Sequence, residues 1–90
     1  MKSEIGTVRE EAVVIGDNPR FFLQREKKTE GRGIIYLLSK QHVNIEPFVG
    51  ERVRVYGHDT QVDLAGYGLP TWDPEAAIDV SRIEGPIPEK

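Results

Sequence analysis

The sequence contains no cysteine, which excludes disulfide bonds and thiolate chemistry and fits a reducing compartment. No uninterrupted apolar run approaches the roughly 18 residues that a membrane-spanning helix needs. The polar start at residues 1–4 lacks the apolar core of a secretory signal peptide. We therefore expect a cytoplasmic protein without a membrane segment.

A basic surplus is also missing, because the formal net charge is −3. Residues 1–40 hold eight Lys or Arg against six Asp or Glu, whereas residues 41–90 hold four against nine. Proteins that bind nucleic acid strongly usually carry a basic surplus, since neutralising phosphates supplies much of their affinity. Any nucleic-acid site in this chain must therefore be local.

The sequence lacks the common catalytic motifs, including G-x-S-x-G, the P-loop and H-E-x-x-H. The sequence 58–59 followed by Asp63 contains oxygen and nitrogen ligands, but its spacing matches no known metal-ligand motif. Solvated polar groups in loops explain these residues more simply, and Glu10-Glu11 is more simply a pair of exposed carboxylates than an acid–base pair. We expect no catalytic residue, no metal and no cofactor.

What the chain does contain is a strong β-strand signal at residues 51–57. Val53 and Val55 alternate with the polar or amphipathic residues Arg52, Arg54 and Tyr56, which is the period-two pattern of a strand with one buried face. The glycine that follows at position 57 is expected to form a bulge or bend inside this strand, which then continues to about residue 64.

Immediately before this strand, residues 44–50 predict a single helical turn. Asn44 can cap the turn, a proline is tolerated in its first residues and Gly50 can end it. Ile45, Phe48 and Val49 have i, i+3, i+4 spacing and give the turn an apolar face. We expect this face to cover one end of a β-structure.

Three further strands are expected before the helical turn. Residues 5–15 are rich in β-branched side chains, but their apolar parity changes, which predicts a long strand with a bulge near residues 10–11. Residues 20–25 alternate, with Phe21 and Leu23 on one face and Phe22 on the other. Residues 34–38 are almost wholly apolar, as in a strand buried on both sides.

The C-terminal part of the chain is less clear. Residues 65–74 form a long loop with glycines, prolines and aromatic residues. Residues 75–83 fit either a helix or a strand, and we predict a strand from about Ala77 to Ser81 because a four-stranded open sheet would leave an edge unpaired. We therefore expect one domain over residues 1–84 and a disordered, proline-containing tail at residues 85–90.

This order of elements resembles the OB-fold (the oligonucleotide- and oligosaccharide-binding superfold) over roughly residues 5–84. The resemblance lies in the early glycine of a long first strand, the paired hairpin strands at residues 21–23 and 35–38, the helical turn, and the sequence 48–57 that leads out of it. It implies an all-β, five-stranded Greek-key OB-fold barrel with one short helical turn between the third and fourth strands. It also implies a binding module that uses the faces of strands two and three and the adjacent loops.

Aromatic residues beside a basic segment are the candidate binding surface. Phe22, Tyr36 and Tyr56 are opposite to the inferred core phase, and exposed rings flanked by cations suit base stacking combined with phosphate contact. The alternative is that these rings cover a second small core or a dimer contact, and that the basic segment is simply solvated. The candidate nucleic-acid-binding residues are Arg20, Phe22, Arg25, Lys27, Lys28, Arg32, Tyr36, Arg54 and Tyr56.

Tyr67 and Trp72, in the long loop, admit two interpretations. They can fold back to cover the open end of the barrel, or they can project as interface anchors, since both residue types are enriched at interaction hot spots. The sequence thus predicts a small non-catalytic binding module. Its ligand is single-stranded nucleic acid on the face of strands two and three, or a protein partner or second copy on the same face and the loop 65–74.

Overall fold

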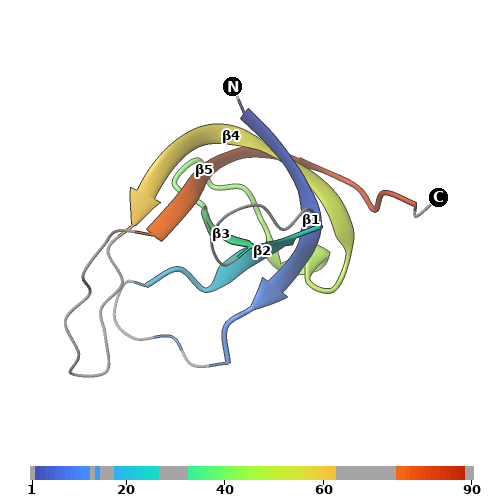
Figure 1. Ribbon diagram of the computed structural model, residues 1–90, viewed down its shortest axis with the longest axis horizontal. Helices are drawn as coiled ribbons and strands as arrows, with labels where there is room; N and C mark the ends of the chain where they lie inside the picture. The colour runs from blue at the N-terminus through green and yellow to red at the C-terminus, as the bar shows by residue number, and fades with distance from the viewer. Residues whose placement is uncertain (1, 13, 15–17, 27–32, 63–74, 89–90) are drawn as a thin grey trace.

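The computed structural model describes residues 2–12, 14, 18–26, 33–62 and 75–88, and these form an all-β, five-stranded closed barrel (Figure 1). The order of strands around the barrel is β1-β2-β3-β5-β4. The elements are β1 (Lys2–Glu10), β2 (Phe21–Arg25), β3 (Ile34–Leu38), the 3-10 turn η1 (Glu46–Phe48), β4 (Arg52–Val62) and β5 (Glu75–Glu84). The predicted all-β, five-stranded barrel with one short helical turn between the third and fourth strands is confirmed.

The barrel closes because β1 pairs with two neighbours. Residues 6–10 of β1 pair with β2, and residues 2–7 pair with β4, both antiparallel. Gly6 takes part in both pairings, and a Cβ atom there would collide with the backbone carbonyl of Gln24. A glycine at this position lets the backbone of β2 approach closely at the point where β1 pairs with both β2 and β4.

The other closure is the parallel pairing of β3 with β5, in which Tyr36, Leu37 and Leu38 lie opposite Ala77, Ile78 and Asp79. All other strand pairs are antiparallel, so the barrel is mixed. In Figure 1, β4 and β5 run side by side as two long curved strands.

The core is formed by alternate side chains from every strand and by one residue next to the 3-10 turn. The predicted inward phase of Val53 and Val55 is confirmed, since both have 0% exposed surface. Burying each such aliphatic side chain contributes about 1.5–3 kcal/mol. The buried cluster comprises Val8, Leu23, Ile35, Leu37, Ile45, Val53, Val55, Ile78 and Val80.

The helical turn between β3 and β4 is present, but its details differ from the prediction. It is a 3-10 turn whose N-cap is Ile45, and no side chain caps it, so the expected role of Asn44 is wrong. Ile45 is buried and Phe48 packs partly against the core, whereas Val49 is 37% exposed. Gly50 has a φ of 85°, the left-handed conformation that glycine adopts at low cost after a helical turn.

A β-bulge occurs where the sequence predicted one, but the extra residue belongs to the partner strand. Tyr56 lies opposite Arg82 and Gly57 lies opposite Val80, so Ser81 of β5 is the residue without a counterpart. Strand β4 therefore keeps a single phase through Gly57. The glycine is needed for another reason, because a Cβ atom there would meet the carbonyl of Asp79.

Two predicted strand boundaries are wrong. β1 ends at Glu10 and does not continue through a bulge to residue 15. One further hydrogen bond, from the amide of Glu11 to the carbonyl oxygen of Arg20 (2.8 Å), follows the β1–β2 register beyond the strand end. β5 is a strand, as predicted, but it covers Glu75–Glu84 because nearly its whole length pairs with β4. The helical alternative for this segment is excluded.

Residues 85–88, for which the prolines predict disorder, lie against the start of β4. The amide of Ile87 donates to the carbonyl oxygen of Arg52 (2.6 Å), and the Arg52 guanidinium donates to the carbonyl oxygen of Pro88 (2.9 Å).

Within the described part of the chain, no helix is long and apolar enough to cross a membrane.

Candidate functional site

A pair of aromatic rings on the outer side of β2 and β3 is the centre of the candidate site. Phe22 and Tyr36 lie directly opposite each other across the two strands. Their ring centroids are 6.3 Å apart and the planes are inclined by 59°, a tilted arrangement that is favourable for aromatic pairs. Because Leu23 and Ile35 beside them point into the core, these two rings point outward.

The two rings differ in accessibility. Phe22 is half-buried, whereas Tyr36 retains only 6% of its surface. The expectation that Tyr36 is an exposed aromatic residue is therefore wrong. Its strand is apolar on both faces, as the sequence indicated, because Tyr36 is covered on the outside just as Ile35 and Leu37 are covered on the inside. Tyr36 can support the Phe22 ring but offers little surface of its own.

Arg9 extends the row of outward residues and was missed from the sequence. It lies opposite Phe22 across β1 and β2, and its Nε donates to the Oε1 atom of Gln24 (3.2 Å). A cation thus lies next to the exposed ring on the same face. The alternation of Thr7 and Arg9 against the buried Val8 is the signal that could have identified it.

The predicted basic residues Arg20 and Arg25 do not join this face. Arg25 shares the inward phase of Leu23 at the end of the barrel, and its Nη1 lies 3.8 Å from the carboxylate of Glu4. Arg20 forms an ion pair with Glu10, and its guanidinium carbon lies 5.5 Å from the centroid of the Phe21 ring. Both cations therefore have a carboxylate partner.

Arg54 and Tyr56 lie in a different cross-strand row from Phe22 and Tyr36. They face outward from β4, where Tyr56 pairs with Ser3 of β1 and with Arg82 of β5. The guanidinium carbon of Arg82, which the sequence did not single out, lies 4.3 Å from the centroid of the Tyr56 ring. One face of that ring is already occupied by a cation–π contact.

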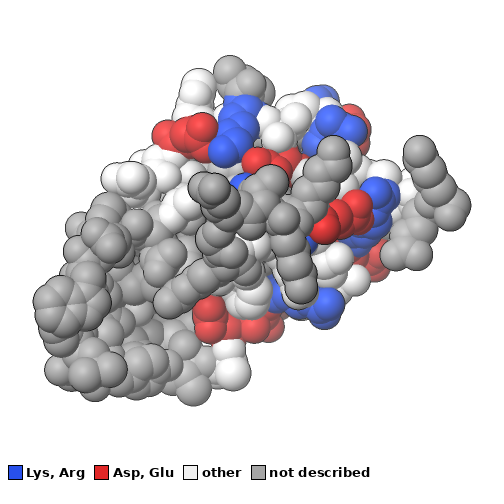
Figure 2. Space-filling view, viewed as in Figure 1, with Lys and Arg blue, Asp and Glu red and all other residues white. Residues whose placement is uncertain are grey.

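The remaining candidates, Lys27, Lys28 and Arg32 in the basic segment and Tyr67 and Trp72 in the loop 65–74, lie outside the described residues. The described surface carries both charge signs close together. Among the described residues visible in Figure 2, Lys and Arg side chains lie next to Asp and Glu.

Two exposed ion pairs have a definite electrostatic effect. Arg52 binds the carboxylate of Glu26 through Nε and through Nη2 (3.1 Å), and this hydrogen bonding lowers the pKa of Glu26 below its ordinary value. Lys2 lies 2.8 Å from Asp59, and the hydrogen bond between them raises the pKa of the Lys2 ammonium group. The Lys2–Asp59 pair joins the adjacent strands β1 and β4, whereas the Arg52–Glu26 pair joins β4 to the end of β2 on the other side of β1.

Among the residues that the structure describes, no three His, Asp or Glu side chains are placed to hold a metal ion. The site therefore presents a partly exposed aromatic ring, a supporting tyrosine and a neighbouring guanidinium, which together can stack on a flat group and contact an anion. No family model matches the chain, and neither curated proteins nor solved structures give a match.

Proposed function

We propose that the barrel is an OB-fold and that the protein is a non-catalytic module that binds single-stranded nucleic acid on the outer face of β2 and β3. The closed five-stranded arrangement, the parallel β3–β5 pairing and the helical turn between β3 and β4 support the OB-fold assignment. In that fold, this face is the usual position for an extended ligand.

The observation that carries the proposal is the Phe22 ring, which is partly exposed, packed against Tyr36 and adjacent to Arg9. A base can stack on such a ring, and a guanidinium beside it can contact the phosphate of the same nucleotide. Stacking accepts any base, so this arrangement favours binding without strong sequence preference.

The electrostatics predict weak binding. The chain has a net charge of −3, and Arg20 and Arg25 already have carboxylate partners. If Arg9 and the basic residues at 27, 28 and 32 supply three or four phosphate contacts, the log–log salt dependence has a slope of about −2 to −3. Binding should therefore be measurable only at low ionic strength.

The test is a titration of fluorescently labelled, single-stranded DNA and RNA of about 15 nucleotides at two salt concentrations. Phe22→Ala should weaken binding by about 1–3 kcal/mol if one base stacks there. Tyr56→Ala is the matched control, because this aromatic residue lies in another row and should leave the affinity unchanged. Absence of binding to any oligonucleotide at low salt would refute the proposal.

Protein recognition by the same face is a second candidate, because Phe22 is a partly exposed aromatic ring supported by the buried Tyr36. Aromatic residues are enriched in protein interfaces, and a single supported ring suits a small apolar contact. In this alternative, Phe22→Ala weakens self-association or partner binding. Sedimentation velocity across a range of protein concentrations, on the wild type and on Phe22→Ala, separates self-association from nucleic-acid binding.

A further inference from the structure

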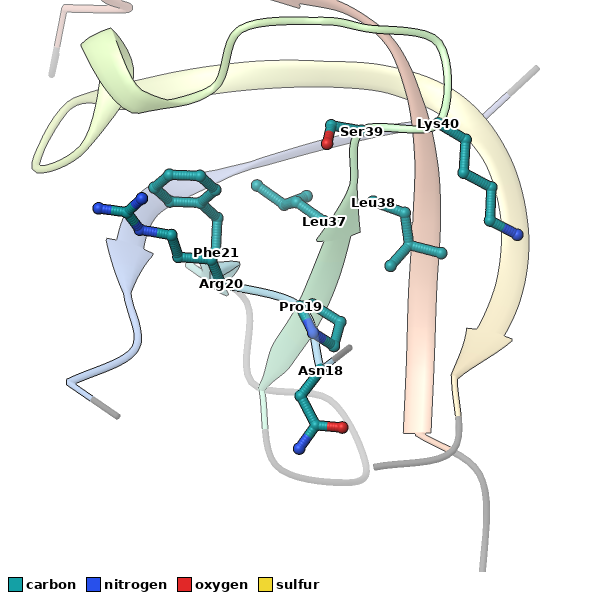
Figure 3. Close-up of a pocket in the computed structure, with 8 residues that line it drawn as sticks. All are labelled: Asn18, Pro19, Arg20, Phe21, Leu37, Leu38, Ser39 and Lys40. Atoms are coloured by element: carbon teal, nitrogen blue, oxygen red, sulfur yellow. The ribbon is translucent and has the colours of Figure 1, made fainter. Parts of the chain in front are cut away.

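A hollow of about 490 Å³ lies where β2 begins and β3 ends, next to the paired residues Phe21 and Leu37. Its walls come from two segments, residues 18–21 before and at the start of β2, and residues 37–40 at the end of β3 (Figure 3). These residues are distinct from the Phe22, Tyr36 and Arg9 surface described above.

The middle of the hollow is apolar and firmly supported. Leu37 is only 2% exposed and Pro19 is buried, so both belong to the packed structure. Phe21 packs partly against the core, and Leu38 is half-buried. A bulky apolar side chain placed here would lose its contact with water without requiring the barrel to rearrange.

The rim of the hollow is positively charged on two sides. In Figure 3, Pro19, Leu37 and Leu38 lie around the middle, while Arg20 extends to one side next to the Phe21 ring and Lys40 extends to the opposite side. Among the described residues that line the hollow, none is acidic. The rim of the hollow is therefore locally basic, although the net charge of the chain is −3.

The two cations differ in their present contacts. Arg20 is already paired with Glu10 through Nε, but its side chain is 55% exposed, so solvent weakens this contact. The side chain of Lys40 is exposed and forms no salt bridge within the described part of the chain. Guanidinium and ammonium groups at these positions suit carboxylates.

We propose that this hollow is a docking site for an acidic peptide segment of a partner protein, with one bulky apolar side chain between two carboxylates. In an extended peptide, side chains at i−2, i and i+2 point to the same side. The apolar residue at i then enters the hollow, and the acidic residues at i−2 and i+2 reach Arg20 and Lys40. Charge complementarity on both sides of an apolar centre distinguishes this ligand from a basic peptide or a neutral one.

The test uses the ¹⁵N-labelled protein and the short peptide acetyl-Glu-Ser-Leu-Ser-Glu-amide. We expect saturable amide shifts in the segments 18–21 and 37–40, with affinity in the millimolar range that is usual for so small a ligand. Replacing the leucine of the peptide by alanine, or both glutamates by lysine, should abolish the shifts in these segments. Equal shifts with all three peptides, or no shifts at millimolar peptide, would overturn the proposal.

Variants of the protein provide the second measurement. Lys40→Glu should weaken binding about three- to tenfold, because one exposed ion pair becomes a repulsion. Arg82→Glu, an exposed β5 residue outside the hollow, changes the net charge equally and should leave the affinity unchanged. If both variants weaken binding equally, only net charge is being sensed and the proposal is wrong.

Nucleic acid is the remaining alternative occupant. If single-stranded DNA or RNA shifts the amides of residues 37–40 and the acidic peptide does not, the hollow is part of the nucleic-acid surface and the peptide proposal fails. Phe22→Ala should leave peptide binding intact, since its ring lies outside the hollow. The two proposals can therefore fail independently.

Discussion

The backbone carbonyl oxygen of Asp79 occupies the space that a Cβ atom on Gly57 would need. The two residues belong to neighbouring strands, and the register of β4 against β5 shifts between Tyr56 and Gly57. Because the obstacle is backbone and is paired within the barrel, it cannot move aside as a flexible side chain would. Gly57 is therefore a steric requirement of the β4–β5 pairing.

Gly57→Ala should destabilise the protein by about 2–4 kcal/mol, through overpacking against a backbone atom. Gly50→Ala is the control, because a Cβ atom added there would have no neighbouring atom within 4 Å, and only the φ of 85° opposes the substitution. We expect about 1–2 kcal/mol for that strain. Urea denaturation measures both, and equal losses would contradict the steric explanation.

The inward phase of β4 leads to a second prediction. Val55→Asp places a charge in a fully buried position without a partner and should cost about 3–5 kcal/mol, a large share of the stability of a domain of this size. Arg54→Asp, one position away on the outer face, should cost less than about 1 kcal/mol. Thermal denaturation followed by circular dichroism compares the two variants.

Tyr36 and Phe22 are neighbours, yet they should differ in their effect on folding. Tyr36→Ala removes a ring that is 6% exposed and should cost about 3–5 kcal/mol, as for other buried aromatic residues. Phe22→Ala should cost clearly less, because its ring is partly exposed. Comparable losses of stability in urea denaturation would show that Phe22 is mainly a structural residue.

The ion pair between Arg52 and Glu26 predicts a pH effect. Arg52 lowers the pKa of Glu26 in the folded protein, so this pair stabilises the fold above the pKa of the unfolded chain, near 4.5. The contribution is lost as the pH falls through the lower folded value. ¹³C NMR titration of the Glu26 carboxyl should give a midpoint below 4.5 in the wild type and a higher midpoint in Arg52→Gln. An unchanged midpoint would exclude the pair in solution.

The features that were predicted correctly depend on local sequence. The alternation of Val53 and Val55 with charged residues fixes the phase of β4, and the apolar run of β3 shows that this strand is covered on both faces. Tyr36 points outward, as its phase predicted, and the error concerned only its exposure, because the outer face of β3 is covered as well. Ordinary turn chemistry also explains why Gly50 follows the 3-10 turn.

Other features depend on pairing between distant segments. The position of Ser81 as the extra residue of the bulge becomes visible only when β5 is aligned with β4. Similarly, Arg20 and Arg25 are close in sequence to Phe22, but each has a carboxylate from β1 as its partner. Counting charges near an aromatic residue cannot show that they are already engaged.

The placement of β5 between β3 and β4 has a consequence for how the barrel forms. Tyr36 and Ala77, which pair across the parallel seam, are 41 positions apart (77 − 36). Bringing such distant segments together costs chain entropy before any contact compensates for it. Until β5 inserts, β3 and β4 each expose an unpaired edge, which is a site for association with other chains. We therefore expect that the insertion of the last strand limits the folding rate, and that the β3–β5 seam determines how long the chain remains prone to aggregation.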